Sequence, residues 1–175
     1  HKIVGRGIAR TFQNIRLFKS MTVLENVMIG RHCRTRTGIL GAVCRGPRTR
    51  REEQEIVGTS LALLERTGLA DQADEVAASL PYGAQRRLEI LRALASNPCL
   101  LLLDEPAAGM NPSETAELME NIRRIRDTFQ IAVLLIEHDM NLVMNICEGI
   151  CVLNFGHIIA KGTPEDIQRN EAVIE

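Results

Sequence analysis

The feature that most constrains the fold is a run of four leucines, residues 100–103, that ends in Asp104 and Glu105. A short apolar run with a proline close to each end is typical of a strand buried on both faces, as in a parallel sheet. Ligands of open parallel sheets bind where the strands end. Two adjacent carboxylates at that place suit the chemistry of nucleotide hydrolysis, in which one acid holds Mg²⁺ and the next polarises water. The alternative is a core strand that ends in a solvated acidic turn.

A second apolar run, residues 131–136, ends in Glu137 and His138. A helical pattern with an apolar stripe lies between the two runs. The order strand, helix, strand predicts a right-handed parallel crossover. Both strands then end at the same edge of the sheet, so the sequence predicts a histidine beside the two acids.

Capping residues mark the starts of three predicted helices. An N-cap side chain accepts a hydrogen bond from an exposed amide of the first turn, and a Glu three residues later returns the bond. Thr22 with Glu25 and Asn111 with Glu114 fit this pattern, and Asp139 precedes the apolar residues 140–147. We therefore expect helices to begin at these three places.

A stronger helical period covers residues 85–96, after a turn at residues 81–84. Leu88 and Leu91 face the interior in this pattern. Four charged residues of the helix are predicted to face solvent: Arg86, Arg87, Glu89 and Arg92. A helical pattern also covers residues 50–67. Between it and the helix that begins at Thr22, residues 31–51 are rich in arginine and glycine and form a long connection. We expect its arginines to contact a membrane subunit, anionic lipid or solvent only.

Composition narrows the functional classes. The 175 residues are 45% hydrophobic and 25% charged with a net charge of −1, which fits a globular domain and argues against nucleic acid as a partner. No apolar run approaches the about 20 residues that span a bilayer. We expect the cysteines to be small buried side chains in a reducing compartment, not disulfides or a zinc site. The five cysteines are Cys33, Cys44, Cys99, Cys147 and Cys151.

These motifs together resemble the ATP-binding subunits of ABC transporters. Residues 100–106 resemble the Walker B motif, and residues 80–87 resemble the ABC signature. Residues 109–112 occupy the D-loop position, Gln13 fits the Q-loop glutamine, and His138 fits the switch histidine. Within the family, the sequence is similar to the bacterial importer ATPases for branched-chain amino acids.

The resemblance implies an α/β fold, the P-loop NTPase fold of ABC ATPases. We expect it to be incomplete, with a helical subdomain and the C-terminal half of the parallel-sheet core. Residues 1–19 are expected to be a Q-loop segment at the boundary, residues 20–96 the helical signature subdomain, and residues 97–175 the C-terminal part of the RecA-like core.

The resemblance also implies roles for single residues. Asp104 would bind Mg²⁺, and Gln13 would reach Mg²⁺ or the attacking water. Glu105 would be the general base, and His138 would contact the γ-phosphate of ATP. Six further residues would cap the ATP of a partner subunit or contact that subunit: Pro81, Tyr82, Gly83, Ala84, Gln85 and Asn111. Each residue also has a plain structural interpretation as a strand-end, loop or helix-capping side chain.

Three departures from the family pattern limit these expectations. No Gly-x-x-x-x-Gly-Lys loop occurs in the sequence, which starts at His1 and ends within a helical pattern. We expect that loop to lie before His1, and we expect this chain alone to bind ATP poorly and to be inactive. Pro81 stands where the family commonly has Ser and lacks both an N–H and a side-chain donor. Asn111 stands in place of the D-loop Asp.

The main hypothesis is the ATPase subunit of an ABC importer, for branched-chain amino acids, with ATP and Mg²⁺ as cofactors. Its expected partners are transmembrane permease subunits, a second ATPase subunit and, indirectly, a periplasmic or lipid-anchored amino-acid-binding protein. Its expected location is the cytoplasmic face of the bacterial inner membrane, as a peripheral protein. The alternatives are a non-transport ABC ATPase that acts on nucleic acid or ribosomes, and a non-catalytic fragment with only a partner-binding surface.

Overall fold

The computed structural model describes residues 2–35 and 46–174. The chain forms two compact units, His1–Ile136 and Glu137–Glu175, which are considered separately below. Within the described ranges, no helix is both long enough and apolar enough to cross a lipid bilayer. Part of the predicted long connection, residues 36–45, lies outside the described residues.

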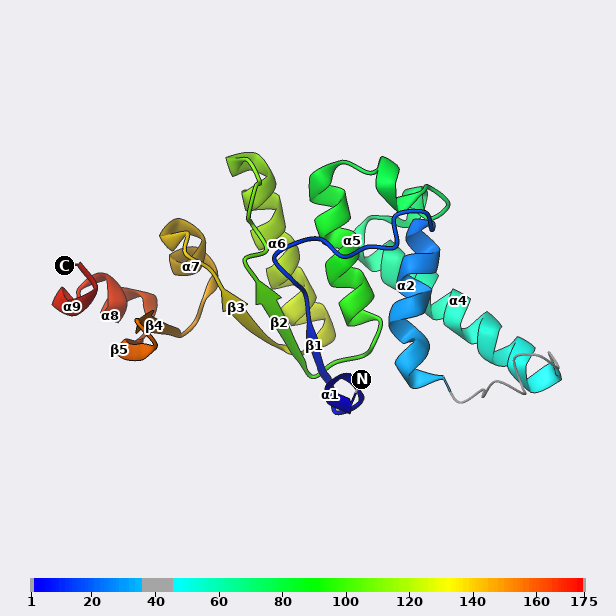
Figure 1. The fold of residues 1–175 in the computed structure, drawn as a ribbon, viewed down its shortest axis with the longest axis horizontal. Helices are drawn as coiled ribbons and strands as arrows, with labels where there is room; N and C mark the ends of the chain where they lie inside the picture. Colours follow the sequence, from blue (N-terminus) through cyan, green and yellow to red (C-terminus); the bar gives the residue numbers. More distant parts are fainter. Residues whose placement is uncertain (1, 36–45, 175) are drawn as a thin grey trace. The chain divides into compact units, whose positions relative to one another are not determined.

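The first unit contains a parallel sheet of three strands in the order β1-β2-β3 (Figure 1). These strands are β1 (Ile8–Arg10), β2 (Leu100–Asp104) and β3 (Ala132–Ile136). Asp104 pairs with Ile136 in the register of β2 and β3. Leu101 and Leu103 of β2 are buried, as expected for the central strand. The parallel crossover predicted from the two apolar runs is therefore confirmed.

Strand β3 differs from β2 in its exposure. In the described part of the chain it pairs with β2 only, and Leu134 and Ile136 are 54% and 53% exposed. β3 is an edge strand here, so its apolar side chains are covered less than those of the central strand.

Helices make up most of the rest of the first unit (Figure 1). They are α1 (Lys2–Gly5), α2 (Val23–Arg31), α4 (Pro47–Thr67), α5 (Tyr82–Leu94) and α6 (Pro112–Phe129), with short 3₁₀ turns η1 (His32–Arg34), η2 (Ala70–Gln72) and η3 (Ala77–Ser79). The predicted capping boxes are present at the start of α2, between Thr22 and Glu25, and at the start of α6, between Asn111 and Glu114.

Helices α2 and α5 pack closely against each other. A methyl group added to Gly30 of α2 would overlap the backbone carbonyl oxygen of Arg92 in α5. Asn26 of α2 is fully buried, and its side chain bonds both the amide and the carbonyl oxygen of Phe18. The close approach at Gly30 thus holds α5, the helix that carries the signature-like residues, against α2.

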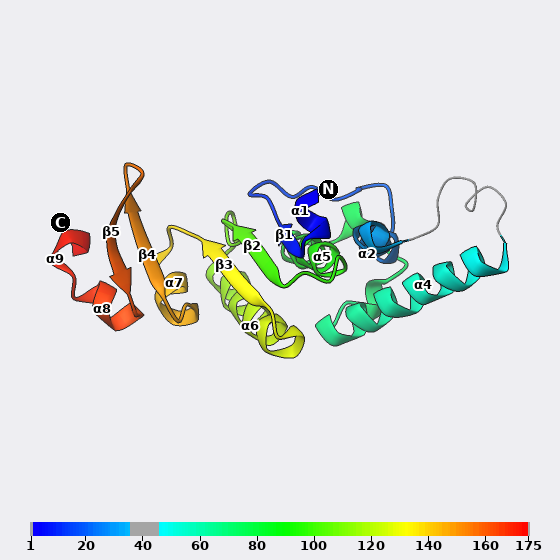
Figure 2. The same cartoon turned by 90° about the horizontal axis from the view of Figure 1, so that it is seen from below.

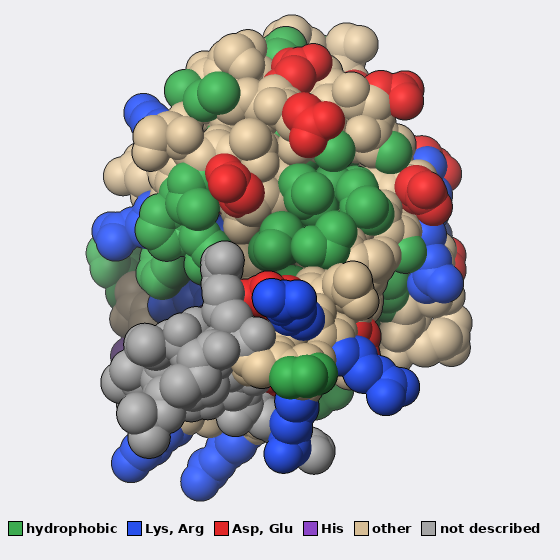
Figure 3. Space-filling view, turned by 90° about the vertical axis from the view of Figure 1, so that its right-hand side faces the viewer, with side chains coloured by type: hydrophobic (Ala, Val, Ile, Leu, Met, Phe, Trp, Pro, Cys, Tyr) green, Lys and Arg blue, Asp and Glu red, His purple; other side chains and the backbone are tan. Residues whose placement is uncertain are grey.

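Arginines are exposed at the start of α4. Figure 3 shows a face of the chain on which hydrophobic side chains form a patch and Lys and Arg side chains gather along the lower border. Arg48, Arg50 and Arg51 are all exposed. They belong to the first turns of a helix that begins at Pro47, so this end of the predicted connection is helical. Proline suits this position because its missing N–H has no partner in the first turn.

The second unit contains an antiparallel hairpin (Figure 2). The unit consists of α7 (Met140–Ile146), β4 (Ile150–Asn154), β5 (His157–Gly162), α8 (Pro164–Gln168) and α9 (Glu171–Ile174). Phe155 and Gly156 both have positive φ, of 46° and 82°, which suits a two-residue hairpin turn. Asp139 caps α7 as expected. After β5 the chain forms two short helices, α8 and α9, which are separated by Arg169 and Asn170.

The predicted burial of the cysteines is wrong. Cys33, Cys99 and Cys151 are exposed and Cys147 is half-buried, and all four thiols are free. Cys99 precedes β2 rather than lying in it. Having apolar neighbours in the sequence therefore did not make these cysteines buried. Cys44 lies outside the described residues.

Candidate active site

The two acids lie where β2 ends. Asp104 is the last residue of the strand, and Glu105 has a φ of +43°, which is uncommon for a residue other than glycine. The amide of Glu105 donates to the carbonyl oxygen of Ile136 at 2.9 Å, so the β2–β3 ladder continues to this residue. The unusual backbone is held in place by this bond, and both carboxylates remain partly exposed.

Side chains from β1 and the residues after it engage both carboxylates. A guanidinium nitrogen of Arg10 lies 2.7 Å from Oδ2 of Asp104. The amide nitrogen of Gln13 donates to Oε2 of Glu105 at 2.7 Å. The structure thus brings together three predicted site residues, Gln13, Asp104 and Glu105. It adds Arg10, which no local sequence signal pointed to.

The donor set fits Mg²⁺ that arrives with a nucleotide. In residues 2–35 and 46–174, no cluster of three or more His, Cys, Asp and Glu side chains could cage a metal ion. Mg²⁺ is usually bound through one or two carboxylates together with phosphates of the substrate. Asp104, with the amide oxygen of Gln13, supplies oxygen ligands of this kind. Arg10 is ion-paired with Oδ2 of the same carboxylate, so Mg²⁺ would have to share or displace this contact.

The signature-like residues begin helix α5 three residues earlier than predicted. Pro81 is the N-cap, and Tyr82, Gly83 and Ala84 form the first turn, together with Gln85. Pro81 lacks an amide hydrogen, but the amide of an N-cap has no partner within its helix, so proline is tolerated there. The first amides of a helix have no partner within it, so this turn can offer N–H groups to an anion.

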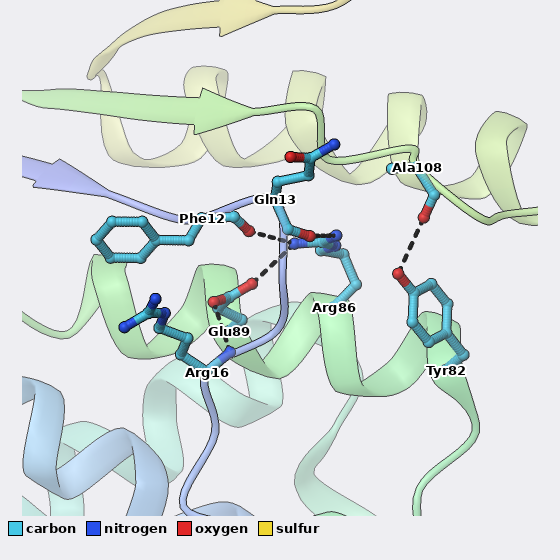
Figure 4. Close-up of polar contacts among 7 residues, drawn as sticks. All are labelled: Phe12, Gln13, Arg16, Tyr82, Arg86, Glu89 and Ala108. Carbon is cyan, nitrogen blue, oxygen red and sulfur yellow. Dashed lines mark hydrogen bonds and ion pairs between the residues drawn. The ribbon is translucent and has the colours of Figure 1, made fainter.

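Tyr82 ties this turn to the segment that follows the acids. Its hydroxyl donates to the carbonyl oxygen of Ala108 at 2.9 Å (Figure 4). Gly109, the next residue, has a φ of +78°. Asn111 then caps α6 by accepting a hydrogen bond from the amide of Glu114 at 3.0 Å. The capping interpretation of Asn111 is confirmed, and its contact with a partner subunit stays a prediction.

The prediction that Arg86 and Glu89 face solvent is wrong. Their side chains are 0% and 1% exposed and form an ion pair of 2.9 Å. Arg86 also donates to the carbonyl oxygens of Phe12 and Gln13, two groups that lie far away in the sequence. The one local signal for this pair is its i, i+3 spacing with opposite charges, which allows pairing on a helix. Arg87 is more exposed and pairs with Glu117 of α6, closer to the prediction.

His138 belongs to the second unit. Its side chain is 79% exposed, and its Nδ1 lies 4.0 Å from Oε2 of the adjacent Glu137. The predicted position of His138 beside Asp104 and Glu105 stays a prediction.

Comparison with known proteins assigns the family. Residues 1–108 match the sequence profile of the ABC transporter family. The chain belongs to this family. Residues 157–175 also match the profile of the branched-chain amino acid ATP-binding cassette transporter. Members of the ABC family with this domain are ATPases that serve transporters, so the predicted enzyme class is confirmed.

Individual relatives agree with this assignment. The high-affinity branched-chain amino acid transport ATP-binding protein LivG of Escherichia coli is 46% identical over 173 residues, which are 99% of this chain and 68% of LivG. BraF of Pseudomonas aeruginosa is 46% identical over 175 residues, 100% of this chain and 69% of BraF. The crystal structure of MJ1267, an ABC transporter ATP-binding cassette in its ADP conformation, matches with a TM-score of 0.80 and 31% identity over 99% of this chain and 68% of that one. The predicted P-loop NTPase fold class is confirmed.

Proposed function

We propose that this chain is part of the ATPase subunit of an importer of branched-chain amino acids. The observation that carries the proposal is the contact of Gln13 with Glu105, next to Asp104, in a member of the ABC family. The substrate class rests on the LivG and BraF relatives and on the C-terminal profile.

Glu105 is the proposed general base. Its carboxylate would orient the attacking water and accept its proton, while the amide of Gln13 holds the carboxylate in place. Asp104 and Gln13 would hold Mg²⁺, which neutralises charge on the phosphates when it is bound. For this, Arg10 must release Oδ2 of Asp104 or share it. His138 would contact the γ-phosphate.

A second ATPase subunit would complete the site. The turn formed by Pro81, Tyr82, Gly83, Ala84 and Gln85 would meet the ATP held by that subunit, through backbone amides rather than a serine hydroxyl. The 175 residues contain no Gly-x-x-x-x-Gly-Lys sequence. We therefore expect these residues by themselves to hydrolyse no ATP, because the backbone amides of such a loop hold the phosphates.

Permease subunits in the membrane are the proposed partners that use the hydrolysis energy. The chain would act as a peripheral protein at the cytoplasmic face of a bacterial inner membrane, and an amino-acid-binding protein would deliver the solute to the permease. The helical part, residues 20–96, would pass motion from the ATP sites to the permease.

Uptake by the assembled transporter tests this function. The full-length protein is reconstituted in vesicles with its permease subunits and binding protein. These vesicles are expected to take up labelled leucine when ATP is enclosed inside them. Sulfate uptake serves as the control for substrate class. Equal uptake of both solutes, or co-purification of the protein with RNA instead of membrane subunits, would contradict the proposal.

A further inference from the structure

A buried ion pair in α5 holds the residues on either side of Gln13. The guanidinium of Arg86 donates to the carbonyl oxygens of Phe12 and Gln13, at 2.8 and 2.7 Å. Its partner Glu89 accepts a hydrogen bond from the backbone amide of Arg16 at 3.1 Å. Figure 4 shows the pair between the helix and this segment. Two side chains of one helix thus fix the backbone at residues 12, 13 and 16.

The same helix also holds the chain on the other side of the acids. Tyr82, in the first turn of α5, donates to the carbonyl oxygen of Ala108, three residues after Glu105. Helix α5 therefore contacts both the segment that supplies Gln13 and the loop that follows Glu105. A displacement of α5 acts on both partners of the Gln13–Glu105 hydrogen bond.

Stability alone does not explain why a buried ion pair, Arg86 with Glu89, occupies this position. A buried ion pair often contributes no more to stability than well-packed apolar side chains of the same volume would. Nε of Arg86 also lacks a hydrogen-bond partner among the described residues, so the pair is not fully satisfied. A guanidinium does offer several donors in one rigid plane, which can bind two carbonyl oxygens and a carboxylate at once. The arrangement is suited to fixing geometry.

We propose that Arg86 and Glu89 are positioning residues that set Gln13 against Glu105 and so link the signature turn to the acids of the same subunit. This inference rests on the proposed function, in which Glu105 is the general base. Arg86 holds the main chain of Gln13, and the side chain of Gln13 holds Glu105. A shift of α5 at Arg86 is thus passed to the base through Gln13.

A mutant cycle in the full-length protein tests the link. The pair variant Arg86→Met/Glu89→Leu removes both charges together, so no buried charge is left without a partner. We expect it to fold and to lower kcat for ATP by about tenfold to a hundredfold, as a small misplacement of a catalytic group does. The KM for ATP is expected to change by less than about twofold. Arg124→Met, which removes an exposed arginine of α6, is the control and should keep kcat.

The decisive comparison is made in the background of Gln13→Ala. If the pair acts through Gln13, adding the pair variant to Gln13→Ala lowers kcat by less than about twofold more. If the fold losses of kcat caused by the pair variant and by Gln13→Ala multiply fully in the combined variant, the inference is overturned. A normal kcat in the pair variant alone, or in Gln13→Ala alone, would also overturn it. Should the pair variant not fold, Arg86→Lys enters the same cycle, because it keeps the buried charge but not the planar set of donors.

Failure of the proposed function is recognised separately. Glu105→Gln is expected to stop turnover whether or not Arg86 and Glu89 position Gln13. If Glu105→Gln keeps normal turnover, the proposed function itself is wrong. If it stops turnover while the cycle is fully multiplicative, only the positioning role of the pair is wrong.

Discussion

Two glycine-to-alanine substitutions in helices should have opposite effects on stability. A Cβ at Gly30 of α2 would overlap the carbonyl oxygen of Arg92 and lie 3.0 Å from its carbonyl carbon and 3.1 Å from Cβ of Ala95. Optimal carbon–carbon separations are about 3.5–4.0 Å. At Gly58 of α4, apart from its chain neighbours and the backbone of its own helix, no atom of the described residues lies within 4 Å of the added Cβ. The chemical change is the same, and only the surroundings differ.

The expected magnitudes follow from these distances. Overpacking costs about 1–3 kcal/mol, and the cost at Gly30 belongs at the upper end because the obstacle is backbone of α5 rather than a flexible side chain. Replacing a glycine in a helix returns at most about 1 kcal/mol. We expect Gly30→Ala to lower the free energy of unfolding by about 2 kcal/mol. Gly58→Ala should raise it by about 0.5–1 kcal/mol.

Urea unfolding of the full-length protein, followed by far-ultraviolet circular dichroism, measures both changes. Wild type, Gly30→Ala and Gly58→Ala are compared under the same conditions, and equal slopes ensure that midpoints report stability. A Gly30→Ala variant as stable as Gly58→Ala would refute the close approach of α2 and α5. It would also remove the argument that α5 is held rigidly against the helical part.

Three further predictions concern single side chains. Asp166 accepts hydrogen bonds from the amide and hydroxyl of Thr163, which lower the pKa of Asp166 below its ordinary 3.8. The carboxylate therefore stabilises the fold above pH 3.8, and this stabilisation is lost as the pH falls through the lowered pKa. The NMR signal of the Thr163 amide should shift over this pH range, and Asp166→Asn should abolish the shift. Burial raises the pKa of the Cys147 thiol, so iodoacetamide should alkylate Cys147 more slowly than the exposed Cys33 in mass spectra of the folded protein, and equal rates would contradict this. Asn111→Ala removes the cap of α6 and should cost about 1 kcal/mol in urea unfolding, whereas no loss would rule out the cap as a source of stability.

The parts of the fold that the sequence predicted correctly depend on local interactions. The leucine run formed the central strand because it is short, apolar and bounded by prolines. The capping boxes at Thr22 and Asn111 formed because each needs only residues three positions apart. The place of Gln13 beside Glu105 followed from the family resemblance, and the structure contains that contact.

The errors concern residues whose partners are distant in the sequence. A helical pattern assigns charged residues to solvent, but Arg86 is buried because carbonyl oxygens 73 and 74 positions away accept its hydrogen bonds. The contact of Arg10 with Asp104 spans 94 positions and has no local signal either. Cys99 was expected to be buried with the leucines that follow it, yet it precedes the strand and is exposed. Tertiary contacts decided the two arginine cases.

The most direct test of the account is ATP turnover by Glu105→Gln in the full-length protein. Glutamine keeps the size and a hydrogen-bonding oxygen of the side chain but cannot accept a proton from water. Because a general base contributes about 10²–10⁴-fold, turnover should fall by at least about a hundredfold. Mg-ATP binding, measured by calorimetry on the same preparation, should be retained. Normal turnover with normal binding would contradict the role of Glu105 and the proposed function built on it.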